Sequence, residues 1–427
     1  MKWIFRLAMM GTLGMAACAD DTANPTADAG SDARIETTLD LGTTTDAAND
    51  INTQVDDAGM DATEDVGADT GTEVCWPAPS ANRTRKLVVS RPYDEDAMAS
   101  GLFVIQDVAL DGTLSPPSGQ FTLSRTSGGK IQFTPDGSVG YVRLDDGKIG
   151  AFRILADGST EIVHQAFAAS EYVSEIVIAP DGQYLYMLTV GFRNVSGGIY
   201  RAKIDCKTGE LTDEGLMTPA KLAYGMEFVS PTRAFVESVD IADTEVPGHV
   251  HEITVGDTIT RVASGSAFTG EDVGLGGFAV TPDAKFAIVG DNGLFSTHSI
   301  SVVSLLNGIS SVQNFPVEDP QDIAVSPFNN AAIILSLEGD KLEIYDVDTS
   351  KNEPLTFRSN LATAAPVLLP ADLVMVRQGD LEGHAYIAEN VAIRHLVFRP
   401  SGTVEDLGLT SNGAGLTGIS GAIGVQP

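Results

Sequence analysis

One short apolar phrase that ends in proline recurs along most of this chain. Its seven copies end at Pro135, Pro180, Pro231, Pro282, Pro327, Pro370 and Pro427. Successive prolines are separated by 45, 51, 51, 45, 43 and 57 residues. Self-similarity with a period of about 40–50 residues, in units rich in strands, indicates a β-propeller.

Each phrase is followed by further short apolar runs, such as 139–144 and 149–154 after the first copy. These runs are rich in β-branched and aromatic residues, which favour strands. Asp-Gly pairs such as Asp136-Gly137 separate the runs, and such pairs form hairpin turns because glycine adopts positive φ without steric cost. No segment shows a sustained helical period, so the sequence predicts an all-β chain.

The two ends of the repeat region set the number of blades. The first segment, with apolar runs at 86–89 and 102–105, has no proline phrase before it, and the last phrase, 423–427, has no runs after it. We expect the C-terminal strand to close the first blade, which removes an exposed seam. The other blades are expected to begin near residues 130, 175, 226, 277, 322 and 365, which gives a seven-bladed β-propeller. A row of separate β-sandwiches is the alternative.

Residues 1–18 have the pattern of a signal peptide. Lys2 and Arg6 precede an apolar run over 7–17, and Met15-Ala-Ala-Cys18 closes it. That ending resembles the lipobox of bacterial lipoproteins, with Met15 where leucine is usual, and it implies lipidation of Cys18. Plain secretory cleavage around Cys18 is the alternative. The apolar run is shorter than the roughly 20 residues that span a bilayer, which argues against a retained membrane anchor.

Residues 19–75 have a different composition from the rest of the chain. They hold 15 acidic residues and one basic residue, Arg34, and they contain no Phe, Tyr or Trp. Such a segment buries too little apolar surface to offset the entropy of ordering, so we expect a disordered acidic tether. A flexible chain of this length has a root-mean-square span of about 40 Å, and repulsion between its carboxylates extends it.

Residues 76–427 form the expected propeller domain, with 43 acidic residues against 23 Lys or Arg. This balance argues against a nucleic-acid partner, whose binding requires clustered positive charge. It also argues against docking of the domain itself on anionic lipid. The sequence contains no nucleotide-binding or nucleophile-elbow motif, and we expect no cofactor.

If Cys18 carries lipid, Cys75 and Cys206 remain as a pair in an oxidising compartment. Cys75 lies at the junction of tether and domain, and Cys206 follows a predicted strand. A disulfide and two free thiols both remain open, because a disulfide requires Cα atoms within about 7 Å and the sequence does not give that distance.

A resemblance to a known family rests on two neighbouring stretches. Ile178-Ala-Pro-Asp-Gly-Gln-Tyr-Leu-Tyr186, followed by Gly198-Ile-Tyr-Arg-Ala-Lys-Ile-Asp205, resembles the YVTN and lactonase-like seven-bladed propellers. The resemblance covers about residues 85–427. Turn and core residues carry it, so it implies the fold rather than an activity.

In lactonase-like propellers the residue five places before the phrase proline faces the central channel and is often His or Arg in the enzymes. The resemblance therefore implies a ring of channel-facing residues at Lys130, Glu175, Met226, Gly277, Asp322, Ala365 and Ala422. Lys130, Glu175 and Asp322 are the candidate catalytic or channel-lining residues. The ring contains no His or Arg, which favours a lining role over hydrolysis.

His249-Val-His251 is the best local metal pattern. Residues two apart on a strand face the same side, so both imidazoles could meet one ion. The sequence identifies no third ligand, and an ordinary pair of solvent-facing histidines is the alternative. We assign no metal.

These features predict a bacterial lipoprotein whose propeller stands away from an envelope membrane, with the outer membrane as the default in a two-membrane cell. The expected function is a non-enzymatic binding or scaffolding module for an unidentified envelope protein or small molecule. The lipid anchor is its expected contact with the membrane. A lactonase-like hydrolase or isomerase with its site in the central channel is the alternative.

Overall fold

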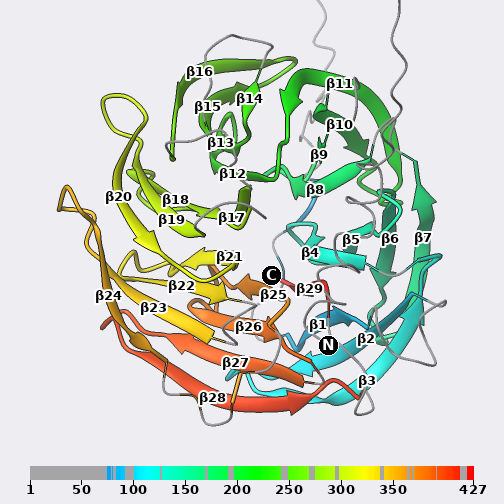
Figure 1. Cartoon of the computed structure of the whole chain (residues 1–427). Coiled ribbons are helices and arrows are strands. Elements are labelled where there is room, and N and C mark those ends of the chain that lie inside the picture. The colour runs from blue at the N-terminus through cyan, green and yellow to red at the C-terminus, as the bar shows by residue number, and fades with distance from the viewer. Residues whose placement is uncertain are drawn as a thin grey trace, which may run out of the picture. The chain divides into compact units, whose positions relative to one another are not determined.

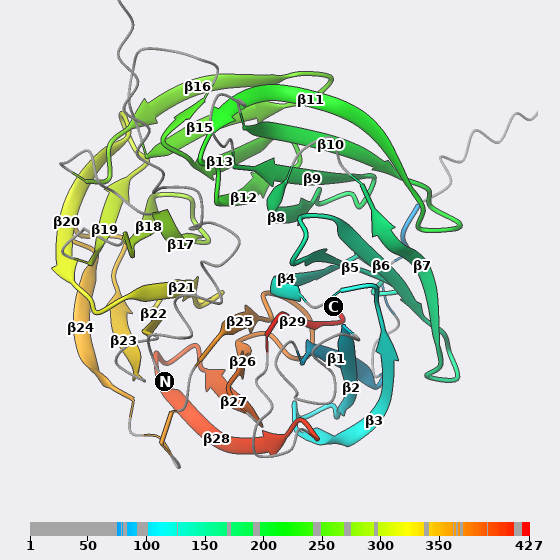
Figure 2. The ribbon, with the colours of Figure 1, turned by 45° about the vertical axis from the view of Figure 1, so that its right-hand side comes forward.

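Seven antiparallel sheets follow one another around a central axis in the computed structural model of the chain (Figure 1). Figure 2 turns the ring by 45° and shows the outermost strands along its rim. The all-β, seven-bladed propeller that the proline phrases predict is confirmed. The structure describes residues 75–77, 79, 83–91, 101–125, 127–168, 172–190, 197–241, 249–268, 275–293, 298–336, 341–361, 363, 366–367, 370–390, 392–413 and 421–427.

The strands of each blade run in chain order from the axis to the rim, except that the first blade takes its innermost strand from the end of the chain. Blade one is β29 (Ile423–Val425), β1 (Arg85–Ser90), β2 (Leu102–Val108) and β3 (Leu114–Thr122). Blade two is β4 (Ser127–Phe133), β5 (Val139–Leu144), β6 (Ile149–Ile154) and β7 (Thr160–Phe167). Blade three is β8 (Val173–Ile178), β9 (Tyr184–Thr189), β10 (Gly198–Ile204) and β11 (Leu211–Lys221), with β14 (Asp240–Ile241) added at its edge.

The remaining four blades repeat this plan. Blade four is β12 (Gly225–Ser230), β13 (Arg233–Glu237), β15 (Val250–Val255) and β16 (Ile259–Gly265). Blade five is β17 (Leu275–Val280), β18 (Phe286–Asp291), β19 (Ser299–Ser304) and β20 (Ser310–Pro316). Blade six is β21 (Pro320–Val325), β22 (Ala331–Ser336), β23 (Lys341–Val347) and β24 (Leu355–Asn360). Blade seven is β25 (Asp372–Met375), β26 (His384–Ala388), β27 (Ala392–Phe398) and β28 (Val404–Ser411). Within the described part of the chain, no helix is long and apolar enough to cross a membrane.

The proline phrase marks the place where an inner strand ends and turns back. In blade two the N–H of Gly137 donates to the carbonyl of Thr134 at 2.7 Å, and Gly137 has a φ of 73°. The carboxylate of Asp136 accepts the N–H of Ser138 at 2.9 Å, which holds the turn. The corresponding turn residues of three other blades also have positive φ, namely Gly182, Ala284 and Asn329. The phrase recurs because one type of turn is built repeatedly.

Apolar packing lies between the blades. Seven clusters of buried apolar side chains are found among the described residues, one at each junction of neighbouring blades. Between blades one and two, the ring of Phe121 lies 5.0 Å from that of Phe103 and 4.6 Å from that of Phe152. Each blade therefore buries both of its faces, and a ring left open would expose two of them.

Ring closure uses the last strand of the chain. β29 pairs with β1 in antiparallel register, with Val88 opposite Gly424. Figure 1 shows this red strand beside the blue strand β1 near the axis. A side chain at Gly424 would come within 2.4 Å of the Ile131 carbonyl oxygen, so glycine is needed for β29 to pack against β4. The predicted composite first blade is confirmed.

Side chains strengthen the junction between blade seven and blade one. The hydroxyl of Tyr386 donates to the carbonyl of Gly112 in the β2–β3 turn at 2.9 Å. Below the same turn, Nδ1 of His384 and Nε2 of His395 are 2.8 Å apart. A side chain on Gly112 would collide with the His384 ring, so this turn residue fits because it is glycine.

Blade seven begins later than the proline spacing predicts. We expected it near residue 365, ahead of Pro370, but its inner strand covers Asp372–Met375. Pro370 therefore precedes the strand that it was expected to end. Proline often ends a strand because it lacks an N–H, but other residues also end strands. The proline phrase is weak in this repeat, and the predicted start of the blade was therefore wrong. Ala365 itself lies outside the described residues.

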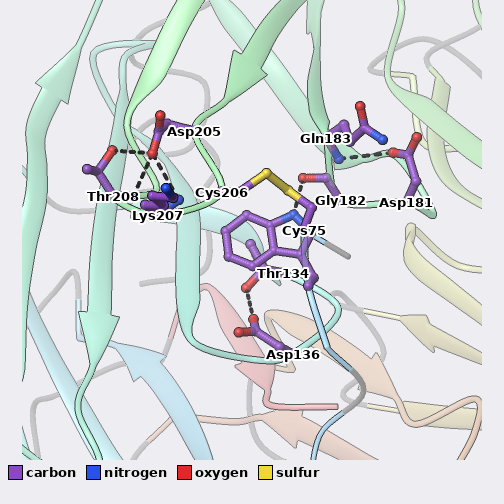
Figure 3. The surroundings of a disulfide bond; sticks show 11 residues. Cys75, Thr134, Asp136, Asp181, Gly182, Gln183, Asp205, Cys206, Lys207 and Thr208 are labelled. Atoms are coloured by element: carbon purple, nitrogen blue, oxygen red, sulfur yellow. Dashed lines mark hydrogen bonds between the residues drawn. A yellow bond between two sulfur atoms is a disulfide. The ribbon is translucent and has the colours of Figure 1, made fainter. Parts of the chain in front are cut away.

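The start of the described chain is fastened to blade three. Cys75 and Cys206 form a disulfide with a Cα–Cα distance of 5.2 Å, across 131 residues of sequence (Figure 3). Cys206 belongs to a tight turn in which the carboxylate of Asp205 accepts the N–H groups of Lys207 and Thr208 at 2.9 and 2.7 Å. The disulfide therefore joins the chain before β1 to a braced loop after β10.

Trp76 adds a packed side chain to this attachment. Its indole is buried in the cluster between blades two and three, and its Nε1 donates to the Gly182 carbonyl at 2.7 Å. A side chain on Gly182 would lie 2.3 Å from the Trp76 ring, so the glycine at this turn makes room for the indole. The packed part of the chain thus includes Cys75 and Trp76, well before the first strand.

Removing both thiols in a Cys75→Ser, Cys206→Ser variant should destabilise the domain. A crosslink over a loop this long restricts the unfolded chain, so we expect a loss of about 2–5 kcal/mol in the free energy of unfolding. Urea titration followed by Trp76 fluorescence measures this loss. Dithiothreitol should lower the midpoint of the parent protein and leave that of the double variant unchanged. An equal response of both proteins would contradict the crosslink.

Candidate functional site

The starts of the inner strands bring charged side chains together around the axis. Lys130 lies on β4, Glu175 on β8 and Asp322 on β21. Figures 1 and 2 place these three strands at the centre of the ring. Of the other ring members, Met226 and Ala422 are buried. Cys18 and Ala365 lie outside the described residues.

An ion pair links opposite sides of the ring. Nζ of Lys130 lies 3.1 Å from Oδ1 of Asp322, although blades one and seven stand between their blades. The Asp322 side chain keeps 9% of its accessible surface, whereas the Lys130 side chain keeps 34%. Burial alone would lower the pKa of Lys130, but the carboxylates of Asp322, Asp372 and Glu175 outweigh it and raise that pKa. The lysine is therefore a fixed cation.

Asp322 also fastens two neighbouring blades. Its Oδ1 accepts the N–H of Ile323 at 2.8 Å, and its Oδ2 accepts the N–H of Leu373, on the inner strand of blade seven, at 3.1 Å. Asp372 repeats the arrangement, because its Oδ2 accepts the N–H of Ile423, on β29, at 3.3 Å. These contacts satisfy backbone donors at the start of an inner strand. Both carboxyl groups thus contribute to ring closure.

Asp372 is the ring member that the sequence missed. It takes the place predicted for Ala365, because it contacts blade one as Asp322 contacts blade seven. Burial, and then the charge of Asp322, raise the pKa of Asp372 well above its usual value, while Lys130 opposes the rise. The spacing of the prolines does not mark Asp372. The signal that the sequence does contain is an acidic residue directly before the apolar run 373–375.

Glu175 is the ring carboxyl with the fewest structural contacts. Its Oε1 accepts the N–H of Ile176 at 3.1 Å, and the residue is half-buried. Burial raises its pKa, and the positive charges of Lys130 and Arg143 oppose that rise. An acid of this kind has the properties of a proton-transfer group, whereas Lys130 and Asp322 are engaged with each other.

A second cross-ring ion pair was not predicted. Arg377, which follows β25, pairs through Nη1 with Oε1 of Glu227 on β12 in blade four. Oε2 of Glu227 accepts the N–H of Val280, on the inner strand of blade five, at 2.8 Å. Arg377 stands five residues after Asp372, where the other blades have the phrase proline. Two ion pairs thus join blades that are not neighbours in the ring, blade two with blade six and blade four with blade seven.

The two histidines of the metal pattern serve the fold. The carbonyl of Ser238 accepts from Nε2 of His251 at 3.0 Å, and Nδ1 of His251 contacts Oγ of Ser264 at 2.7 Å. Nδ1 of His249 accepts the N–H groups of Ala267 and Phe268 at 3.1 and 3.2 Å. No cluster of three or more His, Cys, Asp or Glu suited to a metal occurs among the residues that the structure describes.

Comparison with known proteins places the fold but not the activity. No protein-family model matches the chain, and no curated protein matches its sequence. The structure is similar to the periplasmic gluconolactonase of Pseudomonas aeruginosa, with 12% identity and a TM-score of 0.57, over 81% of this chain and 99% of the other.

Two further solved structures are similar over most of their length. One is a functionally unknown protein from Desulfotomaculum acetoxidans, with 16% identity and a TM-score of 0.53, over 80% of this chain and 99% of the other. The other is a Bacteroides fragilis protein assigned provisionally as a 6-phosphogluconolactonase, with 12% identity and a TM-score of 0.53, over 81% and 99% of the two chains. The chain therefore has the lactonase-like seven-bladed propeller fold.

Replacing Lys130 by Met should destabilise the protein by about 1–3 kcal/mol, because the buried carboxyl of Asp322 loses its ion-pair partner. Lys148→Met is the matched control, since Lys148 pairs with Asp146 at the same 3.1 Å on a more exposed surface. We expect a change of about 0–1 kcal/mol there. Urea unfolding measures both, and equal losses would show that the axial pair contributes no more than a surface pair.

Proposed function

We propose that this protein is a non-enzymatic binding module of the bacterial cell envelope, held to a membrane by lipid on Cys18. The observation that carries the proposal is the engagement of Lys130 and Asp322 with each other and of Asp322 with the neighbouring blade. A hydrolase needs a base and oxyanion donors aimed at substrate, whereas these groups stabilise the ring. The acidic segment that precedes Cys75, predicted to be a flexible tether, would give the propeller reach toward a partner or a small molecule.

A lactone hydrolase is the second candidate, and Glu175 is the residue that favours it. Its carboxyl is half-buried, its pKa is raised by burial, and the fold is similar to that of a periplasmic gluconolactonase. In that case Glu175 would act as the general acid–base group beside the fixed charge of Lys130.

A panel of five- and six-membered sugar lactones separates the two candidates. We expect the purified protein to release acid no faster than buffer alone, and the Glu175→Gln variant to behave identically. Continuous titration of the released acid at neutral pH measures the rate. Turnover by the parent protein that the Glu175→Gln change abolishes would overturn the binding-module proposal in favour of the hydrolase.

The lipid anchor has a separate test in a bacterial expression host. We expect labelled palmitate to enter the parent protein and the membrane fraction to contain it. The Cys18→Ser variant should carry no label and should be found in the soluble fraction. The Cys75→Ser, Cys206→Ser double variant is the control, because it removes two cysteines without touching the proposed lipid site or leaving an unpaired thiol. A parent protein that is soluble and unlabelled would exclude the anchor.

A further inference from the structure

Glu237 differs from every other acidic residue discussed near the axis. It is the last residue of β13, opposite Gly225 of β12, and it is 1% exposed. Among the residues that the structure describes, neither of its carboxyl oxygens has a hydrogen-bond partner. Asp322 and Asp372, by contrast, accept backbone N–H groups. A buried carboxyl without a partner is rare in folded proteins and requires an explanation.

The Glu237 carboxyl lies beside aromatic side chains near the start of two inner strands. A side chain built on Gly225 would lie 3.2 Å from Oε2 of Glu237 and 2.7 Å from Cβ of Phe278, so both groups are on the same side of that glycine. Tyr224 precedes Gly225, and the Glu237 charge adds to the effect of burial in raising the tyrosine pKa. Phe278 belongs to the buried cluster between blades four and five, and Tyr224 packs against that cluster.

The electrostatics of the Glu237 carboxyl favour a cation. Burial raises the pKa of Glu237 well above its usual value, and Lys130 is the cation whose charge opposes that rise. Lys130 is committed to Asp322 at 3.1 Å. An ammonium group beside Glu237 would supply the missing counter-charge, and the faces of Tyr224 and Phe278 would add cation–π attraction.

A metal ion fits this position less well than an organic ammonium group does. Metal ions require several close oxygen, nitrogen or sulfur ligands. In the described ranges no three residues of the usual metal-binding types gather at one point. A primary ammonium needs only one carboxylate and apolar or aromatic neighbours, and Glu237 supplies the carboxylate near Tyr224 and Phe278.

We propose that Glu237, flanked by Tyr224 and Phe278, binds the primary ammonium group of an organic ligand, either a small amine or a lysine side chain of a partner protein. This inference rests on the proposed binding function and names the chemistry that the module recognises. Glu237 lies in blade four and does not belong to the ring of channel-facing residues that precede the prolines by five places.

Isothermal titration of the full chain with n-butylammonium tests the proposal, with n-butanol as the neutral match. We expect butylammonium to bind and n-butanol not to bind. Glu237→Gln should weaken the amine at least tenfold, and the exposed Glu161→Gln should leave its affinity unchanged. Absence of amine binding, or equal binding by parent and Glu237→Gln, would overturn the proposal.

The dependence of binding on pH gives a second readout. A protonated Glu237 must release its proton before it pairs with the amine, so affinity should rise with pH, by up to tenfold for each unit below the pKa of that carboxyl. Titrations in two buffers of different ionisation enthalpy should therefore reveal proton release. Affinity that falls or stays constant between pH 5 and 8 would contradict the assignment.

Two aromatic variants keep the test valid if Glu237→Gln does not fold. Tyr224→Leu and Phe278→Leu retain the carboxyl, and each should weaken butylammonium severalfold through loss of a ring face. Unchanged affinity in both would exclude the proposed walls.

A short peptide with one central lysine, compared with its norleucine counterpart, identifies the source of the ammonium. Tighter lysine-dependent binding than that of butylammonium indicates a protein partner, and weaker binding indicates a small amine.

A failure of this site would leave the binding-module proposal standing. Lactone turnover tests catalysis, and amine titration tests ligand class, so the two results are independent. An inert protein that also ignores butylammonium would be a binding module with a different ligand. A protein that hydrolyses lactones would lose the proposed function whatever its affinity for amines.

Discussion

Every blade of this propeller depends on a neighbour for its stability, because its sheet buries apolar side chains on both faces. The seven junction clusters therefore form a closed cycle, and none is complete unless the ring closes. The pairing of β29 with β1 completes that cycle. Because closure joins the two ends of the domain, the ring cannot be finished until nearly the whole chain is in place.

The charged groups at the axis are best understood as a consequence of closure. Inner strands converge there, and their first backbone N–H groups need acceptors. Asp322 and Asp372 supply those acceptors from the preceding blade. Gathering carboxyl groups in this way concentrates negative charge, which Lys130 offsets from the far side of the ring. Lys130 and Asp322, which the sequence offered as catalytic or channel-lining candidates, therefore have structural partners.

Glu237 stands apart because closure does not explain it. Its strand pairing with Gly225 is ordinary, but its carboxyl accepts no backbone N–H from the described part of the chain. Removing a charge from water is costly unless it is compensated, so a fold keeps such a group where a ligand, a proton or a function compensates it. The unusual carboxyl in blade four therefore indicates a class of ligand. The fold shared with lactonase-like propellers indicates only the architecture.

The fastening at Cys75 and Trp76 has a different physical basis from the ring. A disulfide and one buried indole fix the beginning of the domain to the turns of blades two and three. They act on the chain before β1, where no strand pairing is available to hold it.

The sequence alone determined the fold class, the number of blades and the strand that closes the ring. Those features depend on local signals, since a turn such as Pro135–Gly137 needs particular residues at fixed spacing. The sequence also led to Lys130, Glu175 and Asp322, through a resemblance in the repeat.

Only the tertiary structure decided which of these groups meet. Asp372 replaced the position assigned to Ala365, Arg377 reached Glu227 across 150 residues, and Cys75 met Cys206. Contacts between distant repeats leave no trace in the period of a single sequence, because each repeat carries the same turn whatever its side chains touch across the ring. Local sequence therefore determines the pattern of strands. The charged side chains at the axis meet their partners only when the seven blades come together.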